Sequence, residues 1–404
     1  MTNGALHEVS MSYQLLWNAQ RKLAGVQLCL APRAPTHVDA RPMLKQIDQL
    51  WQTGAAPLQL CTLSAELLAE LLDVTPSALA RIEVSDELLQ DTGIAQRVLR
   101  ASQRGLGLIW RGEPGTHVKA AFIGCFVQHI FSLSTEEALM ALRIAKRSQG
   151  ISAGADPASP VQAGQIYEGI ASRMLAEHVL GQQNAAAMLG WPAEDVLYGY
   201  RQSRIGLDRA AMLRLIKAIE ADAAMEDIEQ LLGQEPLLTY RFLRYVNSAG
   251  AGLRREVDAL RQGLLVLGLT RLKSWLHEHL LQASSDRNLR PVHTVMALRA
   301  RLMASLLDAG EGDALRRELY LCGLLSQIDQ LLAEPLASAL GAVPLPERVN
   351  AALLSQEGPY WPYLAIATAL EGPDATVSDA LCSRYELDSE EVNLTLIRTL
   401  AATT

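Results

Sequence analysis

The sequence predicts two domains of different class, an α/β barrel followed by an all-helical bundle. Three observations support this prediction: a length of 404 residues, an alternation of short apolar runs with amphipathic stretches up to about residue 200, and the fading of strand patterns beyond residue 205. A domain usually holds about 100–200 residues, so this length suits two or three domains. We place the boundary near Arg204, which gives domains of residues 1–204 and 205–404.

In the first half, runs of strand type alternate with stretches of helical type. The expected strands cover residues 26–30, 58–63, 81–84, 107–110 and 129–133, and helices are expected at 40–51, 64–72 and 94–104. Such alternation is typical of a parallel sheet with helices packed outside it. Five or more of these units, closed on themselves, predict a barrel. Residues 150–162, rich in Gly, Ala, Ser and Pro, predict a loop.

In the second half, Leu, Ala and Met recur at helical spacing. Helices are expected at 207–232, 236–247, 258–267, 270–282, 294–307, 314–332, 346–354, 360–370, 377–385 and 389–402. Asp208, Thr270 and Ser389 are the expected N-caps, because their side chains can accept a hydrogen bond from the first helical turn. This pattern predicts a helical bundle.

Composition and charge exclude several classes of function. The net charge is −8 and no stretch is strongly basic, whereas a nucleic-acid-binding protein needs a basic footprint to neutralise phosphates. No apolar stretch approaches the ~20 residues that span a membrane, and the first ten residues do not resemble a signal peptide. The five cysteines are scattered without metal or redox spacing. We expect a cytoplasmic protein with no cofactor, no membrane segment and no nucleic-acid partner.

A set of residues in the second half forms an ordered motif. Gln234-Glu235-Pro236-Leu237-Leu238 opens it, Asn247-Ser248-Ala249 follows, Gly268 and Trp275 come next, and Gly323-Leu324-Leu325 and Asp329 end it. Over about residues 208–404 this pattern resembles the HDOD domain. HDOD domains are similar in fold to HD phosphohydrolases, which hold a metal with adjacent His and Asp. Here Gln327-Ile328-Asp329 stands where that pair is sought, and a lone carboxylate is a poor metal site.

Two interpretations of the Asn247-Ser248 pair remain open. The first is that it closes a helix and its turn by hydrogen bonds from side chain to backbone. The second is that it binds a partner.

With the second half interpreted in this way, the first half resembles the EAL domain, the TIM-barrel phosphodiesterase of cyclic di-GMP. The resemblance places this chain in the EAL–HDOD signalling family. At the replaced positions, it aligns Gln27 with the signature Glu, Thr62 with a metal-binding Asn, Arg111-Gly112 with an Asp-Asp pair, Ser132 with a catalytic Lys and Tyr198 with a Gln. Two family carboxylates are kept, at Glu83 and Glu177.

The EAL reaction uses two metal ions, held by several carboxylates and an Asn, to activate water. Only two carboxylates of that set remain here, and Arg111 would repel a divalent cation. The resemblance therefore implies a degenerate barrel and a chain that is not an enzyme. The first hypothesis is a signalling scaffold that binds another, unidentified signalling protein. The second is a receptor that binds cyclic di-GMP without hydrolysing it, with Arg111 as a candidate phosphate contact. No constellation supports a third hypothesis, an enzyme of another type.

Overall fold

The computed structural model describes residues 5–33, 38–51, 54–74, 80–148, 158–248, 257–307 and 312–403, and the chain forms two compact units. Unit 1 contains residues Met1–Asp195 and Ala369–Thr404, and unit 2 contains Val196–Thr368. The first division lies near the predicted boundary. The end of the chain, which the sequence assigned to the helical half, contacts the barrel instead. Within the described residues, no helix is long and apolar enough to cross a membrane.

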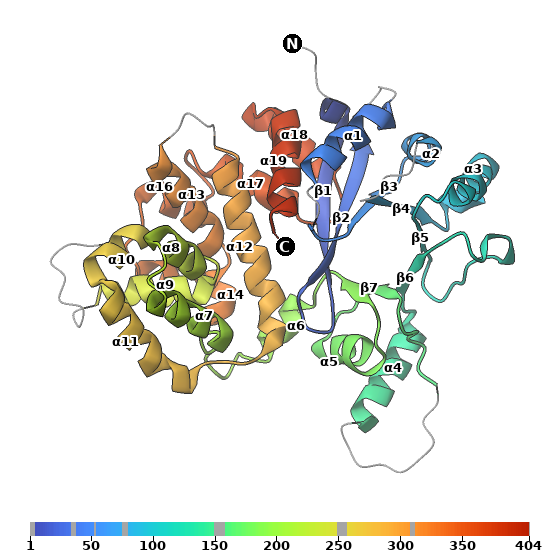
Figure 1. The fold of residues 1–404 in the computed structure, drawn as a ribbon. Helices are drawn as coiled ribbons and strands as arrows, with labels where there is room; N and C mark the ends of the chain where they lie inside the picture. The colour runs from blue at the N-terminus through green and yellow to red at the C-terminus, as the bar shows by residue number, and fades with distance from the viewer. Residues whose placement is uncertain are drawn as a thin grey trace. The chain divides into compact units, whose positions relative to one another are not determined.

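Unit 1 is a closed eight-stranded barrel (Figure 1), as the sequence predicts. The strands are β1 (Val9–Trp17), β2 (Leu23–Pro32), β3 (Leu58–Thr62), β4 (Ala80–Ser85), β5 (Leu108–Arg111), β6 (Gln128–Ser132), β7 (Ile166–Glu168) and β8 (Ala187–Leu189). Strands β2 to β8 run parallel, and β1 is antiparallel to both of its neighbours. The sequence analysis missed β1, β7 and β8, because β1 belongs to a hairpin and the other two have three residues each.

Helices connect the parallel strands. They are α1 (Ala40–Leu50), α2 (Ala65–Asp73), α3 (Thr92–Gln103), α4 (Thr135–Ser148) and α5 (Arg173–Glu177). A further helix, α6 (Ala193–Tyr198), follows β8 and crosses the division between the units. Side-chain oxygens of Asp39, Ser64 and Asp91 cap α1, α2 and α3 by accepting from backbone N–H groups of the first turn. The predicted loop at 150–162 lies mostly outside the described residues.

The last two helices, α18 (Thr376–Tyr385) and α19 (Ser389–Ala401), pack on β1. Because β1 and β2 form a hairpin, no helix follows β1 to cover its outer face, yet almost every residue of β1 is buried. The Ser378 hydroxyl donates to the Met11 carbonyl over 3.1 Å. Asn393, 2% exposed, donates to the carbonyls of Leu6 and Val9 over 3.0 and 2.8 Å. The end of the chain thus supplies the cover that the hairpin lacks.

Unit 2 is helical. Its helices are α7 (Arg209–Glu220), α8 (Met225–Gly233), α9 (Pro236–Val246), α10 (Leu260–Leu267), α11 (Leu269–His279), α12 (Arg290–Ser305), α13 (Asp313–Leu325), α14 (Ile328–Leu332), α15 (Leu336–Gly341), α16 (Glu347–Asn350) and α17 (Trp361–Ala369), which ends at the division between the units. The helix expected at 207–232 is divided into α7 and α8, with Asp222 at a φ of 50° between them. The helix expected at 314–332 is likewise divided into α13 and α14.

The three predicted N-caps have different outcomes. The Asp208 side chain accepts from the Ala211 N–H over 2.7 Å and caps α7, as expected. Thr270 is wrong as a cap, because α11 begins earlier, at Leu269 after Gly268. Ser389 is also wrong, because Asp388 accepts from the Glu390 N–H and caps α19. In both errors another residue close before the predicted one marks the start of the helix.

We expect Asn393→Ala to destabilise unit 1 by about 2–3 kcal/mol. The substitution leaves the Leu6 and Val9 carbonyls without this donor, and a buried polar group that loses its partner costs about 1–3 kcal/mol. Urea denaturation measures the change. Arg398→Ala is the matched control, because Arg398 lies on the same helix, is 57% exposed and makes only a surface ion pair with Glu391, worth about 1 kcal/mol or less. Equal losses for the two variants would contradict the role given to Asn393.

Candidate functional site

A polar layer lies at the carboxyl ends of the barrel strands, where barrel enzymes place their active sites. On β5, β6 and β7, an inward isoleucine is followed two residues later by a polar residue: Ile109 by Arg111, Ile130 by Ser132 and Ile166 by Glu168. Residues two apart in a strand point to the same face. The three isoleucines belong to one buried apolar cluster, so the polar residues lie above an apolar layer.

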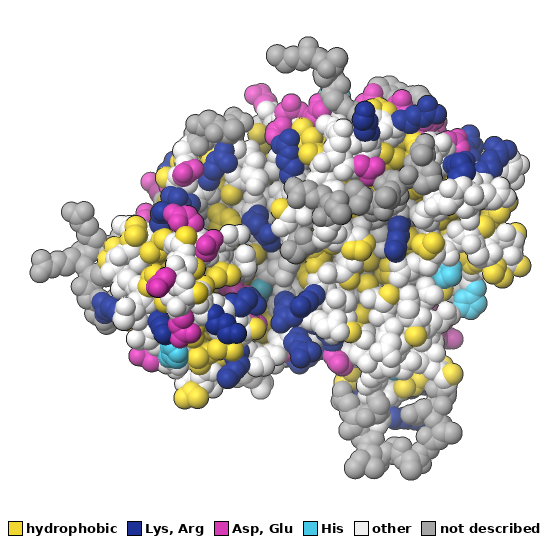
Figure 2. Space-filling model, in the orientation of Figure 1, with side chains coloured by type: hydrophobic (Ala, Val, Ile, Leu, Met, Phe, Trp, Pro, Cys, Tyr) yellow, Lys and Arg dark blue, Asp and Glu magenta, His cyan; other side chains and the backbone are white. Residues whose placement is uncertain are grey.

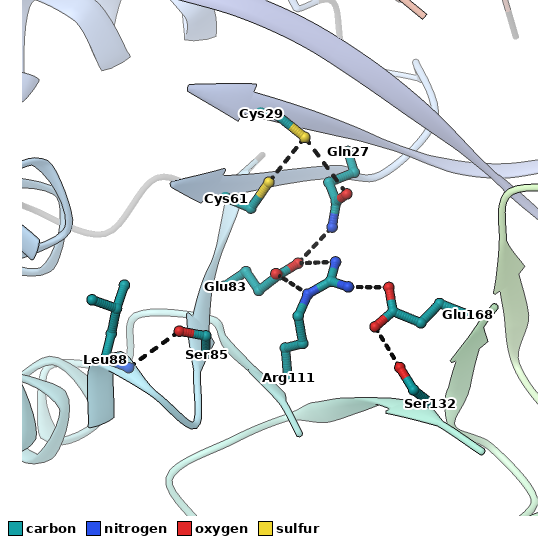
Figure 3. Close-up of polar contacts among 9 residues, drawn as sticks. All are labelled: Gln27, Cys29, Cys61, Glu83, Ser85, Leu88, Arg111, Ser132 and Glu168. Carbon is teal, nitrogen blue, oxygen red and sulfur yellow. Dashed lines mark hydrogen bonds and ion pairs between the residues drawn. The ribbon is translucent and has the colours of Figure 1, made fainter. Parts of the chain in front are cut away.

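Arg111 is the centre of this polar layer. Its Nε and Nη2 atoms bind the carboxylate of Glu83 from β4, and its Nη1 atom binds the carboxylate of Glu168 from β7. Figure 3 shows the guanidinium between the two carboxylates. Glu83 is 5% exposed, and Arg111 and Glu168 are each 22% exposed. One cation therefore joins two acidic groups from opposite parts of the layer, in the forked geometry that suits guanidinium and carboxylate.

Hydrogen bonds extend this pairing in both directions (Figure 3). On one side, the Ser132 hydroxyl donates to Glu168 over 2.7 Å. On the other side, the Gln27 amide, fully buried, donates to Glu83 over 2.5 Å and accepts from the Cys29 thiol over 3.8 Å. The Sγ atoms of Cys29 and Cys61 are 3.1 Å apart. We call these seven residues the barrel network.

Burial and charge oppose each other in the barrel network. Burial raises the pKa of Glu83 above its ordinary value, although Arg111 acts to lower it. Burial would lower the pKa of Arg111, but the charges of Glu83 and Glu168 raise it above its ordinary value. The hydrogen bond with Cys29 and burial raise the pKa of the Cys61 thiol. Arg111 thus remains a cation, and it supports the ionised form of Glu83.

The described residues of this layer do not fit the two divalent metals that the EAL resemblance implies. Hard divalent cations require several oxygen ligands, and both carboxylates of the network already bind the Arg111 guanidinium. In the described parts of the chain, no three His, Cys, Asp or Glu residues are grouped so that they could hold a metal ion. We therefore derive no chemical step through a metal at this site.

The remaining predicted barrel positions lie outside the network. Thr62 is buried, and its hydroxyl accepts from the Ser64 N–H over 3.1 Å at the turn after β3. Gly112 packs on a buried tryptophan, since a Cβ there would lie 2.1 Å from the Trp110 ring. Glu177, 52% exposed, pairs with Arg21 instead of Arg111.

Tyr198 lies on α6, on the unit 2 side of the division, with its side chain 58% exposed and stacked under the Arg201 guanidinium.

Sequence reasoning missed Glu168, the second carboxylate that Arg111 binds. The only signal was its place directly after an apolar pair, Ile166-Tyr167, and before Gly169. A three-residue strand is too short for its period to be recognised. Arg21 was missed as well, because it lies in the turn between β1 and β2 with a φ of 59°, away from any motif.

In unit 2, the Asn247-Ser248 pair closes the end of α9 and joins it to Val257. The Asn247 amide donates to the carbonyls of Leu243 and Val257 over 2.8 Å each and accepts from the Val257 N–H over 2.8 Å. The Ser248 hydroxyl donates to the Tyr245 carbonyl over 2.7 Å. These are the side-chain to backbone bonds of the first interpretation of this pair. Ala249 lies outside the described residues.

Gly268 and Gly323 meet steric requirements of the helix packing. Gly268 has a φ of 78°, a left-handed conformation that favours glycine, between α10 and α11. A Cβ on Gly323 would lie 2.7 Å from the Cα of Ala300 on α12.

The other motif residues begin or support helices. Pro236 is the first residue of α9 and Glu235 its N-cap position. Trp275 is buried and stacks on the Tyr245 ring. Asp329 lies in the first turn of α14. The Glu235 carboxylate also contacts the buried His293 at Nδ1, 2.9 Å away, a contact that the sequence analysis did not foresee.

We expect Arg111→Met to lower the free energy of unfolding by about 3 kcal/mol. Removing one partner of a buried ion pair costs about 3–5 kcal/mol. Because Arg111 is 22% exposed, we expect a value at the lower end of that range. Because the folded-state pKa of Glu83 is raised, the stability that this group contributes is present at low pH and is lost as the pH rises through that pKa. Without Arg111 the pKa of Glu83 rises further, so more of this carboxyl group is neutral near pH 5 than near pH 8. The loss in free energy of unfolding caused by Arg111→Met, which we call the deficit, should therefore be smaller near pH 5 than near pH 8.

Urea denaturation at the two pH values measures this deficit. Arg97→Met is the matched control, because Arg97 forms a more exposed ion pair with Asp73 in the same unit, with 2.9 Å between Nε and Oδ2, and such pairs contribute about 1 kcal/mol or less. An Arg111→Met deficit that does not change with pH would show that the uncompensated charge of Glu83 is not its origin.

Comparison with known proteins identifies the helical part. The HDOD domain family matches residues 209–340, which confirms the resemblance that the sequence motif indicated. Among curated proteins, the chain is 23% identical over 255 residues to cyclic di-GMP phosphodiesterase CdgJ of Vibrio cholerae. That alignment covers 60% of this chain and 58% of CdgJ, so the chain spans little more than half of the relative's length.

Two solved structures match with lower identity than CdgJ. The MmoQ response regulator of Methylococcus capsulatus has a TM-score of 0.38 and 18% identity, covering 48% of this chain and 98% of MmoQ. The EAL enzyme Bd1971, solved with cAMP and cyclic di-GMP bound, has a TM-score of 0.30 and 13% identity, covering 46% of this chain and 61% of that protein.

One prediction from the sequence requires correction. The loss of metal positions predicted that the chain is not an enzyme, and the similarity to CdgJ, a phosphodiesterase, contradicts that prediction. Replacements at motif positions therefore do not by themselves establish that this chain lacks activity. What the comparisons show for this chain itself is an HDOD domain over residues 209–340 of its helical part.

Proposed function

We propose that this chain is a bacterial signal-transduction protein of the cyclic di-GMP system that acts as a scaffold, with its HDOD domain binding a partner signalling protein. The observation that carries the proposal is the pairing of Arg111 with Glu83 and Glu168. These three charged side chains lie on β4, β5 and β7, and the connected bonds of the barrel network reach six strands, β2 to β7. A barrel stabilised in this way suits a rigid platform for a binding domain.

The HDOD domain offers an exposed apolar anchor for a partner. Leu281, in the short 3₁₀ helix Leu280–Gln282 after α11, is 94% exposed. Burying a leucine side chain contributes about 1.5–3 kcal/mol to association, so such a residue can contribute strongly to binding. Leu63, which follows β3 in unit 1, is 88% exposed and provides a comparison of nearly equal exposure.

A second candidate function is binding of cyclic di-GMP by the barrel, and the similarity to CdgJ favours it. The nucleotide carries two phosphates, and Arg111 is the cation of the barrel network, 22% exposed. Guanidinium binds phosphate as it binds carboxylate, by paired hydrogen bonds. In this candidate function a phosphate would compete with Glu83 and Glu168 for the same N–H groups.

We expect Leu281→Asp to weaken partner capture from a native-host extract about tenfold or more, and Leu63→Asp to leave it unchanged. The free energy gained by burying one leucine side chain corresponds to a change in affinity of about tenfold or more. Quantitative mass spectrometry of proteins retained on the immobilised full chain measures the effect. Each variant is the matched control of the other, because both introduce the same charge at a highly exposed position. Loss with Leu63→Asp alone would assign the interaction to unit 1 and contradict the role of the HDOD domain.

For the second candidate, we expect saturable binding of cyclic di-GMP with a dissociation constant below about 10 μM, near −7 kcal/mol, and at least tenfold weaker binding by Arg111→Met. Isothermal titration calorimetry measures both, with Arg97→Met as the control. Absence of heat at millimolar nucleotide would reject this candidate. Because CdgJ is a phosphodiesterase, the same samples are assayed for hydrolysis with Mg²⁺ or Mn²⁺ added. Turnover that Glu83→Gln abolishes would assign the activity to the barrel network.

A further inference from the structure

A cavity of about 710 Å³ lies in unit 2, apart from the barrel network, and of the predicted HDOD motif only the first residue, Gln234, lines it. Residues of α8, α10, α12 and α13 line it. Sites for small organic molecules usually have volumes of about 300–1,000 Å³. The proposed scaffold function assigns no role to this cavity.

Part of the wall is formed where α8 meets α13. The Tyr320 hydroxyl donates to the carbonyl of Gly233 over 3.0 Å. A Cβ on Gly233 would lie 3.3 Å from the Tyr320 ring and 3.7 Å from a methyl group of Leu260, so the glycine allows the ring to lie close. Burial raises the pKa of Tyr320 to about 12. The hydrogen bond and the close packing hold the ring in place before any ligand binds.

Most of the surface area that the wall exposes to the cavity is apolar. Leu260, Leu265 and Leu321 line it together with small residues, among them Ala304 and Ala314. Leu265 is 63% exposed, unusual for a leucine next to a cavity, and its neighbour Val266 is 48% exposed. A ligand in the cavity would cover apolar surface that water now contacts. Each Å² of apolar surface removed from water contributes about 25 cal/mol of favourable binding free energy.

Charges around the cavity balance one another. Four arginines and four carboxylates occur among the described lining residues, so their formal sum is zero. Arg261 pairs with Glu226 at 2.6 Å and with Glu229 at 3.4 Å, and Arg317 also reaches Glu229 at 3.4 Å. Figure 2 shows both signs of charge beside hydrophobic side chains where Figure 1 places α8 and α10. A charged ligand would lose its hydration without meeting an opposite net charge.

We propose that this cavity binds a small, uncharged and largely apolar organic molecule. The apolar wall supplies the binding free energy, and the fixed Tyr320 ring provides a flat surface for an aromatic ligand. The amide side chains of Gln230, Gln234 and Gln262, which also line the cavity, offer donors and acceptors for a polar but uncharged edge. This inference is independent of the proposed scaffold function, because it uses no residue of the barrel network and no partner protein.

A pair of fluorescent probes tests both the site and its preference for an uncharged ligand. N-phenyl-1-naphthylamine is uncharged, and 8-anilinonaphthalene-1-sulfonate is the same ring system with one added negative charge. We expect the full chain to bind the uncharged probe saturably, at one site, and at least tenfold more tightly than the sulfonate. Titration with each probe, followed by emission, gives the two dissociation constants.

Ala314→Trp fills the cavity from the second residue of α13, where the alanine is exposed, so the helix can accept the larger side chain. We expect at least tenfold weaker binding of the uncharged probe. Ala210→Trp is the matched control, because Ala210 is exposed, is the second residue of α7 and does not line the cavity. Leu265→Asp provides a second test at a 63% exposed position, and it too should weaken the uncharged probe. Circular dichroism checks the fold of each variant.

Three results would overturn the proposal. The first is no saturable binding of the uncharged probe. The second is equal loss in Ala314→Trp and Ala210→Trp, which would place the probe elsewhere. The third is tighter binding of the sulfonate, which would show that the cavity prefers anions. Weaker binding of the uncharged probe by both Ala314→Trp and Leu265→Asp, with unchanged binding by Ala210→Trp, would support the proposal.

Discussion

Two carboxylates near the same end of a closed barrel create the central electrostatic constraint of unit 1. Glu83 and Glu168 come from β4 and β7, and the barrel brings them close enough for one guanidinium to bind both. Ionised carboxylates removed from water are costly unless they are paired and hydrogen-bonded. Arg111 meets that requirement because its N–H donors lie in one plane and point in several directions. The positions of Gln27 and Ser132 follow from the same requirement, since each donates to one of the two carboxylates.

A second constraint comes from the order of the strands. Starting the barrel with a hairpin means that β1 has no following helix, and its outer face must be covered by another part of the chain. Residues from the far end of the chain provide that cover through α18 and α19, with Asn393 and Ser378 bound to backbone carbonyls of the first residues. Unit 1 is therefore formed by two separate parts of the chain, and the helical unit lies between them in sequence.

Local bonds have a larger part in unit 2. Asn247 joins the end of α9 to Val257 by two hydrogen bonds and donates a third to Leu243 within α9, and Gly323 allows α12 and α13 to approach closely. Residues of this kind explain why the HDOD motif is recognisable in sequence: each meets a steric or hydrogen-bonding requirement that few other residues can meet. The cavity differs in this respect, because its wall combines ordinary leucines, alanines and paired charges from four helices. No pattern in the sequence marks such a wall.

The sequence by itself determined the class of each half, since alternating strand and helix periods predict a barrel and continuous helical periods predict a bundle. It also determined the HDOD motif and the Asp208 cap of α7, because these depend on neighbouring residues. Only the tertiary structure decided which side chains meet: that Arg111 binds Glu168 from a three-residue strand, that Glu177 pairs with Arg21, and that the last two helices cover β1. Those contacts join residues far apart in the chain, and local periodicity carries no information about distance in space.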